Sequence, residues 1–441
     1  MTRSPQTRFI VSQGGSFEGT LRVPGDKSVS HRALMLGALA EGETFIEGFL
    51  ESEDTRATMA AFACMGVDIE QKGPGKLKIH GVGLQGLSAP DRVLDLGNSG
   101  TSVRLLAGIM SGQQFDSVLV GDESLMQRPM LRIVEPLRQM GASIQCSRDG
   151  TLPLEIRGGC DLVGIEYPMP VASAQLKSSI LLAGLFAKGQ CKVTEPAVTR
   201  DHTERMLEFF GCTLSRKDET VHLESIKLEG QSITVPADIS SAAFFMVAAT
   251  ICPGSDLLIE DVGVNPTRYA VIEILQMMGA EIEVQNQRLV SGEPIADIRI
   301  RSAALQGIPI PEHLIPIAID EVPVLMIAAA CAEGETTIRN AAELRVKESD
   351  RIHAMCEGLI RTGIAVEEFE DGMTVRGGPM TGAEIESFGD HRIAMSFAVA
   401  GLVARGRMQI RDVANVNTSF PEFAACFEKF SLQLEVNESD E

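Results

Sequence analysis

The chain has 441 residues, of which 44% are hydrophobic and 22% are charged, and this balance is typical of a globular chain with two or three domains. Its 39 basic and 60 acidic residues give a net charge of −21, which argues against a general nucleic-acid binder or a protein that adheres to anionic membranes. Small anionic ligands remain compatible with this charge, because a local group of Lys and Arg dominates at short range.

The nine cysteines form no C-x-x-C pair, so neither a zinc motif nor a redox motif is predicted. Their apolar surroundings, as at Cys64 and Cys331, are typical of reduced thiols in a cytoplasmic protein. Residues 1–5 lack the apolar core of a signal peptide, and runs such as Ile393 to Ala404 are shorter than the roughly 20 residues that span a bilayer. We therefore expect a cytoplasmic protein without a membrane span.

The predicted elements repeat along the chain. A segment with the helical hydrophobic period ends in an apolar residue and Gly, and an alternating strand follows, as in Met65-Gly66-Val67-Asp68-Ile69-Glu70. Gly at this place can take a positive φ and end the helix. The six stops share this pattern, the last two more weakly, and lie at positions 66, 141, 211, 279, 363 and 431.

The first half of each repeat has its own helix stop. Leu39–Ile46 matches Cys331–Ile338, and in both a long apolar helix ends at Gly before a short strand. Looser copies cover 186–194, 251–259 and 403–410. The pattern predicts an α/β unit of about 70 residues, used six times.

Two echoing turns suggest where the chain passes between domains. Val23-Pro24-Gly25-Asp26 is matched by Val235-Pro236-Ala237-Asp238, and each precedes a helix. Two groups of three repeats therefore predict one domain from 25 to 236 and a discontinuous domain of 1–24 plus 237–441.

Six predicted helix starts carry Ser, Asn, Asp or Thr. Capping explains any one of them, but equivalent helices would gather their N-termini on one face, where unpaired N–H groups favour anions. Basic residues recur at the same places: Lys27, Arg32, Arg104, Arg128, Arg200, Lys347, Arg351 and Arg392. This supply of cations suits ligands that carry several anionic groups.

Two acidic residues are candidate proton carriers. A helix cap is the simpler interpretation of Asp320, and a salt bridge is the simpler interpretation of Glu348, which lies between cations. Lys347 and Arg351 would share one face if their segment is helical. His391 is either a base or a buried or capping residue.

Taken together, these segments resemble the EPSP synthase family in the family's order, from about residue 9 to 430. The matching stretches are Pro24–Arg32, Leu96–Thr101, Arg128–Met130, Ala172–Lys177, Leu344–Arg351 and Gly389–Arg392. The resemblance implies a two-domain inside-out α/β barrel of six βαβαββ-type repeats, three per domain, with the substrate cleft between the domains.

The resemblance also implies the reaction. The enolpyruvyl group of phosphoenolpyruvate passes to the 5-hydroxyl of shikimate 3-phosphate by addition and elimination, on the path to chorismate and the aromatic amino acids. A monomer that needs no cofactor and no metal is expected.

The site residues that the resemblance implies fall into three sets. The catalytic set is Asp320, Glu348 and Lys27. The residues that would hold shikimate 3-phosphate are Lys27, Ser28, Arg32, Ser173, Ala174, Gln175, Arg200, Asp320 and Lys347. The residues that would hold phosphoenolpyruvate are Lys27, Gly100, Arg128, Gln175, Arg351 and Arg392.

Several positions differ from the plant and enteric form of the family. Ala174 replaces a second Ser, Glu343 replaces Asn, and residues 417–421 lack a Lys. With Arg200, these differences resemble the other bacterial class. Gly100 stands where herbicide-insensitive members have Ala, so we expect inhibition by glyphosate in competition with phosphoenolpyruvate.

Two alternatives remain open. UDP-N-acetylglucosamine enolpyruvyl transferase shares the fold, but it usually has a Cys just before Arg-Pro, and the loop Gly121–Pro129 contains none. A non-catalytic repeat scaffold would not bind small dianions tightly.

Overall fold

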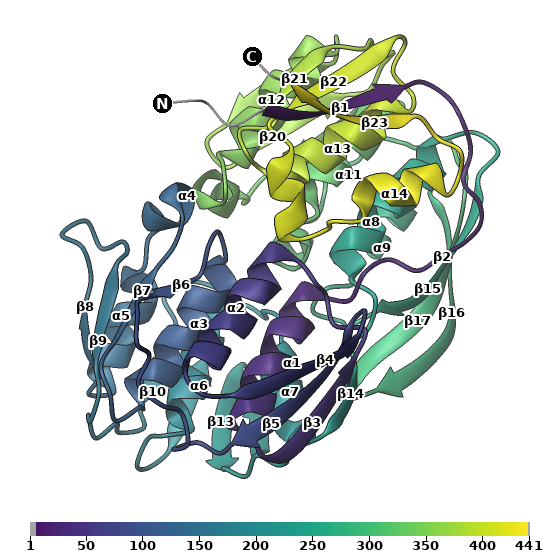
Figure 1. Ribbon diagram of the computed structural model, residues 1–441. Coiled ribbons are helices and arrows are strands. Elements are labelled where there is room, and N and C mark those ends of the chain that lie inside the picture. Colours follow the sequence, from purple (N-terminus) through teal and green to yellow (C-terminus); the bar gives the residue numbers. More distant parts are fainter. Residues whose placement is uncertain (1–5, 440–441) are drawn as a thin grey trace. The chain divides into compact units, whose positions relative to one another are not determined.

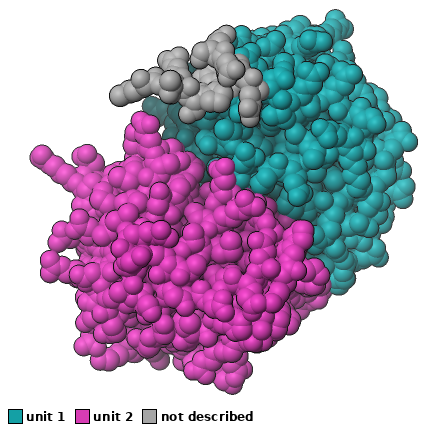
Figure 2. Space-filling model, viewed as in Figure 1, with its two compact units in different colours: residues 1–24, 237–288, 294–441 teal, residues 25–236, 289–293 magenta. Residues whose placement is uncertain are grey.

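The chain divides into two units in the computed structural model, which describes residues 6–439 (Figure 2). Unit 1 comprises Met1–Pro24, Ala237–Arg288 and Pro294–Glu441, and unit 2 comprises Gly25–Pro236 and Leu289–Glu293. Residues 1–5 and 440–441, which the sequence assigns to the discontinuous domain, lie outside the described residues. Among the residues described, no helix is both long and apolar enough to cross a membrane.

One short segment departs from the expected division. Residues 289–293 link β16 (Glu281–Val290) to β17 (Glu293–Arg301), and they group with unit 2 although the strands lie in unit 1. His202 Nδ1 lies 2.7 Å from Glu293 Oε1, and the Thr234 N–H donates to Ser291 Oγ at 2.9 Å. A hairpin turn gives no local sign of contacts with residues that are distant in the sequence. The sequence analysis therefore placed residues 289–293 in the discontinuous domain.

Unit 2 contains three four-stranded sheets, each with a parallel pair at one edge and two antiparallel pairings beyond it. The first sheet has the order β14 (Ser232–Thr234), β3 (Glu41–Glu47), β5 (Lys76–Val82), β4 (Asp68–Gly73). The second has the order β6 (Leu94–Asp95), β7 (Ser117–Val120), β9 (Leu154–Arg157), β8 (Ser143–Gln145). The third has the order β10 (Glu166–Pro168), β11 (Cys191–Thr194), β13 (Thr220–Ser225), β12 (Thr213–Lys217).

Three helices of unit 2 are buried almost all round, and they are α1 (Lys27–Leu39), α3 (Gly100–Ser111) and α6 (Ala174–Gly184) (Figure 1). Their apolar residues are spread round the helix rather than along one stripe, which is typical of interior helices. The second helices of the repeats are one-sided instead, and they are α2 (Glu53–Cys64), α5 (Leu131–Gln139) and α7 (His202–Phe209). A short helix, α4 (Glu123–Met126), precedes α5. Helices inside and strands outside give the inside-out barrel.

Unit 1 repeats this plan. Its sheets have the orders β16-β17-β15-β2, β18-β20-β19 and β21-β22-β1-β23. The strands not yet given are β1 (Gln6–Ser12), β2 (Glu18–Leu21), β15 (Asp256–Gly263), β18 (Glu335–Ile338), β19 (Ala365–Phe369), β20 (Gly372–Arg376), β21 (Glu384–Glu386), β22 (Arg407–Arg411) and β23 (Leu434–Ser439). In the three-stranded sheet, isolated parallel bridges from Gln306 to Glu333 and from Pro309 to Thr337 take the place of the edge strand.

The interior helices of unit 1 are α8 (Ile239–Ile251), α11 (Val322–Cys331) and α13 (His391–Gly401). The remaining helices are α9 (Ala270–Met277), η1 (Glu312–Leu314), α10 (Ile315–Ala318), η2 (Ala342–Val346), α12 (Arg351–Arg361), η3 (Ala414–Thr418) and α14 (Phe423–Glu428). Strands from the ends of each unit complete a sheet: β14 pairs with β3 in unit 2, and β1 lies between β22 and β23 in unit 1. The predicted sixfold α/β repeat is confirmed.

The predicted helix stops are confirmed in all six repeats. The five glycines at 66, 141, 211, 279 and 363 have φ between 88° and 107°. Ser431, at the sixth position, has φ 56°, a conformation that costs a residue with a side chain about 1–2 kcal/mol. The backbone geometry of the repeat therefore persists where the glycine does not.

Candidate functional site

Five of the six interior helices begin at a side-chain cap, as predicted. Asp26, Ser99, Ser173, Asp238 and Asp390 each accept a hydrogen bond from a backbone N–H in the first turn. The interpretation of Asp320 as a cap is wrong. Glu321 occupies the position before α11, no side chain caps this helix, and residues 319 and 321 both have helical backbone angles. A capping residue needs an extended backbone, so the carboxylate of Asp320 is available for other contacts.

The sequence-predicted residues form two sets, one in each unit. In unit 2, α1 begins at Lys27, whose Nζ lies 2.8 Å from Asp54 Oδ2 on α2. The Asp54 residue is buried and the Lys27 side chain is 22% exposed, so this ammonium group is oriented yet accessible. Asp54 was not predicted, because an acidic residue in the first turn of a helix is explained by the helix dipole alone.

Arg32 lies one turn further along α1 and is buried. Its Nε donates to Thr203 Oγ1 at 2.7 Å and its Nη2 donates to Ser178 Oγ at 2.9 Å. Its Nη1 donates to the carbonyl of Ser28 at 3.0 Å. Burial lowers the pKa of Arg32 to about 10, although Glu204 acts in the opposite direction. The guanidinium thus stays charged at neutral pH, held by neutral oxygens rather than by a carboxylate.

A second group gathers at the start of α3. Arg104 Nη1 donates to Gln175 Oε1 at 2.7 Å, and Arg128 Nη2 donates to Asn98 Oδ1 at 2.7 Å. Both arginines are buried. A Cβ at Gly100 would lie 3.0 Å from Arg104 Nη1 and 3.2 Å from Arg128 Nη1. The absence of a side chain at Gly100 therefore lets two guanidinium groups approach one backbone position, an arrangement suited to a carboxylate or phosphate.

The rest of the unit 2 set lies at the starts of α6 and α7. Ser173 caps α6, Ala174 is its first residue, and Gln175 Nε2 donates to Thr101 Oγ1 at 3.0 Å. Arg200 is half-buried and lies two residues before α7. Its charge acts to lower the pKa of Arg32, so the two cations lie near one another.

In unit 1, three cations surround the carboxylate of Asp320. Lys347 Nζ lies 3.7 Å and Arg351 Nη1 lies 3.5 Å from Asp320 Oδ1, and Arg392 Nη2 lies 4.0 Å from Oδ2. Arg392 also donates to the Asp320 carbonyl at 2.8 Å. Four predicted residues from three separate segments of the sequence thus meet in space.

Arg351 is the most enclosed of these cations. Its Nε lies 2.7 Å from Asp390 Oδ2, and its Nη2 lies 2.5 Å from Glu348 Oε2, which confirms Glu348 as a salt-bridge partner. Burial opposes the charge of Arg351, but Asp390, Glu348 and Asp320 outweigh it and raise its pKa. Burial likewise opposes the charge of Asp390, yet Arg351 outweighs it and lowers the pKa of that carboxyl. His391, the other candidate base, is buried beside Asp390 in the first turn of α13.

The condition under which Lys347 and Arg351 would share a helix face is not met. Helix η2 ends at Val346, Lys347 has an extended backbone, and α12 begins only at Arg351. The two side chains meet at Asp320 because the chain turns there. Burial lowers the pKa of Lys347, while Asp320 acts to raise it.

Three residues behind Arg392 were missed by the sequence analysis. Arg268 Nη2 donates to Ser240 Oγ at 2.5 Å and lies 3.5 Å from Glu321 Oε1. Arg392 Nη2 donates to the same Ser240 oxygen at 3.3 Å. All three missed residues are buried, and their contacts fix the direction of Arg392. No sequence motif links them.

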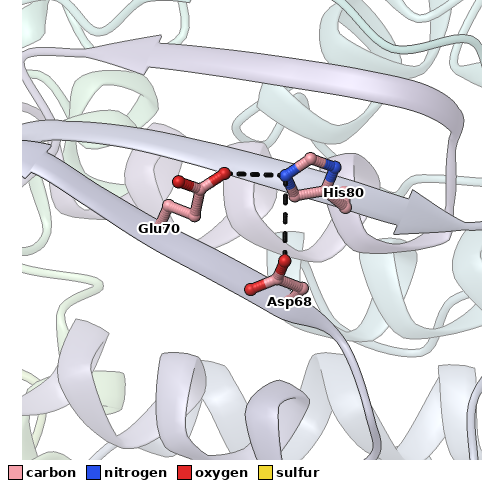
Figure 3. Close-up of side chains that lie close together, drawn as sticks. All are labelled: Asp68, Glu70 and His80. Atoms are coloured by element: carbon pink, nitrogen blue, oxygen red, sulfur yellow. Dashed lines mark hydrogen bonds and ion pairs between the residues drawn. The ribbon is translucent and has the colours of Figure 1, made fainter.

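The described residues contain one group with the spacing of metal ligands, formed by Asp68, Glu70 and His80 on β4 and β5 (Figure 3). His80 Nε2 lies 2.8 Å from Glu70 Oε1 and 3.8 Å from Asp68 Oδ2. Lys72 forms an ion pair with Glu70, and Lys72 and His80 lower the pKa of that carboxyl to about 2. Because an ammonium group and an imidazole already hold these oxygens, we assign the group no metal.

Comparison with known proteins shows which family the chain resembles. The model of the family described as EPSP synthase (3-phosphoshikimate 1-carboxyvinyltransferase) matches residues 11–427. A 3-phosphoshikimate 1-carboxyvinyltransferase from Methylococcus capsulatus is 58% identical over 97% of this chain and 98% of its own length. One from Nitrosococcus oceani is 59% identical over 94% of both chains.

A solved structure gives the same result. The chain is similar to an EPSP synthase from Acinetobacter baumannii, with a TM-score of 0.88 and 54% identity over 98% of this chain and 100% of that one. The fold expected from the sixfold repeat is thereby confirmed over nearly the whole length. The chain belongs to the EPSP synthase family, the 3-phosphoshikimate 1-carboxyvinyltransferases of the shikimate pathway.

Proposed function

We propose that the two sets of residues act together on one pair of substrates, shikimate 3-phosphate and phosphoenolpyruvate. The observation that carries the proposal is the carboxylate of Asp320 among Lys347, Arg351 and Arg392. Such an arrangement can accept a proton and stabilise an anion in one place. The proposal draws one set of residues from each unit.

The unit 2 set is suited to binding shikimate 3-phosphate. Arg32 and Arg200 supply guanidinium forks for a phosphate or carboxylate, and Lys27 supplies a point charge. The N-terminus of α6, with Ser173, adds N–H groups that favour an anion. The proposed set is Lys27, Ser28, Arg32, Ser173, Ala174, Gln175 and Arg200, joined by Asp320 and Lys347 from unit 1.

Phosphoenolpyruvate would share Lys27 with shikimate 3-phosphate and would use the cations outside that first set. The pair formed by Arg104 and Arg128 beside Gly100 supports this, because two forks can hold the phosphate and the carboxylate of one small molecule. Arg104 is added here to the predicted set of Lys27, Gly100, Arg128, Gln175, Arg351 and Arg392. The cations of this set would also stabilise the phosphate as it leaves.

Asp320 is the proposed base for the 5-hydroxyl proton of shikimate 3-phosphate. The oxygen then attacks the enol carbon, while an acid protonates the methylene carbon to form a tetrahedral ketal. Glu348 is the candidate acid, assisted by Lys27, and it must take up a proton before it can donate one. Removal of a methyl proton and departure of phosphate restore the double bond. General acid–base catalysis contributes typically about 10²–10⁴-fold, so positioning must supply much of the rest.

Phosphate release tests the proposal. Wild-type enzyme is given phosphoenolpyruvate with shikimate 3-phosphate, and in parallel phosphoenolpyruvate with UDP-N-acetylglucosamine. We expect release only with shikimate 3-phosphate. Release only with the sugar nucleotide would identify the sister activity, and no release with either would support the scaffold alternative. We also propose that the enzyme is a cytoplasmic monomer, in keeping with its nine free thiols.

A further inference from the structure

A buried ion network lies beneath the segment that carries Arg200. Lys177, on α6, has a fully buried side chain, and its Nζ lies 2.9 Å from Glu195 Oε1 and 2.6 Å from Glu204 Oε1. Glu195 is equally buried and also lies 2.7 Å from Arg216 Nη2. Lys177 is two residues beyond Gln175, so one helix carries both a proposed ligand-binding residue and this ammonium group.

The network fixes every polar group of Thr199, the residue before Arg200. The Thr199 N–H donates to Glu195 Oε1 at 3.1 Å, and the Thr199 hydroxyl donates to the same oxygen. The Thr199 carbonyl accepts from Lys177 Nζ at 3.5 Å. The N–H, the carbonyl and the hydroxyl of this residue are thus all held by one buried ion pair.

The same ammonium group also reaches the first turn of α7. Its second partner, Glu204, follows Thr203, whose hydroxyl accepts from Arg32 Nε. The negative charge of Glu204 also acts to raise the pKa of Arg32. Of the two guanidinium groups proposed to bind shikimate 3-phosphate, Arg200 directly follows a residue that Lys177 holds, and Arg32 donates to the neighbour of another.

Stability alone does not account for this network. Apolar residues of equal volume often replace a buried ion pair without loss of stability. The ions instead fix the position of the backbone, because their hydrogen-bond donors and acceptors hold it in one place. We propose that Lys177 and Glu195 are positioning residues that act through Thr199 to hold Arg200 where it binds shikimate 3-phosphate. This inference rests on the proposed function.

The test compares Lys177→Met with Thr199→Val, which removes only the hydroxyl contact. We expect the KM for shikimate 3-phosphate to rise about tenfold or more in the first variant and about threefold in the second. The KM for phosphoenolpyruvate and kcat should stay within about twofold of the wild type. Lys192→Met is the matched control, because Lys192 pairs with Glu166 at the protein surface and should have no effect.

Combination with Arg200→Ala separates positioning from a general structural role. If Lys177 acts through Arg200, adding Lys177→Met or Thr199→Val to Arg200→Ala should change the KM for shikimate 3-phosphate by less than about twofold. Effects that multiply in the double variants, or an unchanged KM in the single variants, would overturn the inference. If Lys177→Met does not fold, the Thr199→Val cycle decides. Failure of the proposed function would appear separately, as wild-type enzyme that does not turn over shikimate 3-phosphate.

Discussion

The two sets of site residues hold their cations in different ways. In unit 2, Arg32 is held by hydroxyl and carbonyl oxygens, and Arg104 is held by the amide of Gln175. In unit 1, Arg351 is held by the carboxylates of Asp390 and Glu348 and lies 3.5 Å from that of Asp320. A cation with neutral partners can still pair with an anionic ligand. A cation among carboxylates orients those groups and lowers their pKa. The difference suggests that unit 2 chiefly binds anions and that the carboxylates of unit 1 move protons. Lys27, which pairs with Asp54 in unit 2, is an exception, and Arg351 and Arg392 of unit 1 are also proposed to bind phosphoenolpyruvate.

The largest effect should follow from Asp320→Asn. The amide keeps the size and the hydrogen-bonding oxygen of the side chain but cannot accept the 5-hydroxyl proton. We expect kcat to fall about 10³-fold, within the usual range for loss of a general base. Phosphate release under saturating substrates measures this change. Activity near that of the wild type would remove Asp320 from the proton transfer.

Asp390→Asn tests the carboxylates that hold Arg351. Because Arg351 lowers the pKa of Asp390, the ionised form stabilises the fold above the unfolded pKa of about 4. This contribution is lost as the pH falls through the lower, folded value. The variant should be about 3 kcal/mol less stable at neutral pH and should lose less stability on acidification.

Urea unfolding over a series of pH values measures both effects. Asp350→Asn is the matched control, since Asp350 caps α12 but its side chain is 39% exposed and pairs with Arg345. Because Asn caps a helix about as well as Asp, only the exposed ion pair is lost, and the free energy of unfolding should fall by less than about 1 kcal/mol. Equal losses of unfolding free energy in the two variants would show that the buried Asp390 stabilises the fold no more than the exposed Asp350 does.

Arg32→Gln tests the binding role of unit 2. Removal of a buried guanidinium that can hold a phosphate should raise the KM for shikimate 3-phosphate about 100-fold, with a much smaller change in kcat. Arg56→Gln is a suitable control, because Arg56 is exposed and its ion pair with Glu51, at 3.4 Å, lies at the surface. A fall in kcat as large as the rise in KM would break the proposed division between the units.

Gly100→Ala should have the smallest effect. The new Cβ would lie 3.0 and 3.2 Å from two guanidinium nitrogens, so each side chain must move by a few tenths of an ångström. We expect the KM for phosphoenolpyruvate to rise several-fold, which corresponds to a loss of about 1 kcal/mol of binding free energy. Competitive inhibition by glyphosate should weaken as well. Steady-state kinetics with glyphosate measures both. Wild-type enzyme that is indifferent to millimolar glyphosate would refute the expected inhibition.

The periodic features of the fold were predictable from the sequence, because local backbone preferences produce them. The helix stops follow from glycines that can take a positive φ, and five caps follow from Asp and Ser before apolar helices. The sixth cap failed because α10 leads almost directly into α11, so the backbone on both sides of Asp320 is helical rather than extended.

The supporting contacts of the site were not predictable. The bonds that join Ser240 to Arg268, Glu321 and Arg392 span 28, 81 and 152 residues. The cations and the two acidic residues were singled out by their places at helix starts and in loops, but their individual roles came from segments that resemble a known family. Asp54 and Lys177 are buried supporting residues to which the resemblance assigns no role, and only the three-dimensional structure reveals them.

The division between a binding unit and a proton-transferring unit is tested most directly by one titration. Shikimate 3-phosphate is titrated into the Asp320→Asn variant, and the dissociation constant is measured by calorimetry. The account predicts a value within about threefold of the wild type, because the cations of unit 2 are unchanged and the amide retains its hydrogen bond. A loss of affinity of a hundredfold or more would show that Asp320 serves mainly to bind the substrate and would contradict the account.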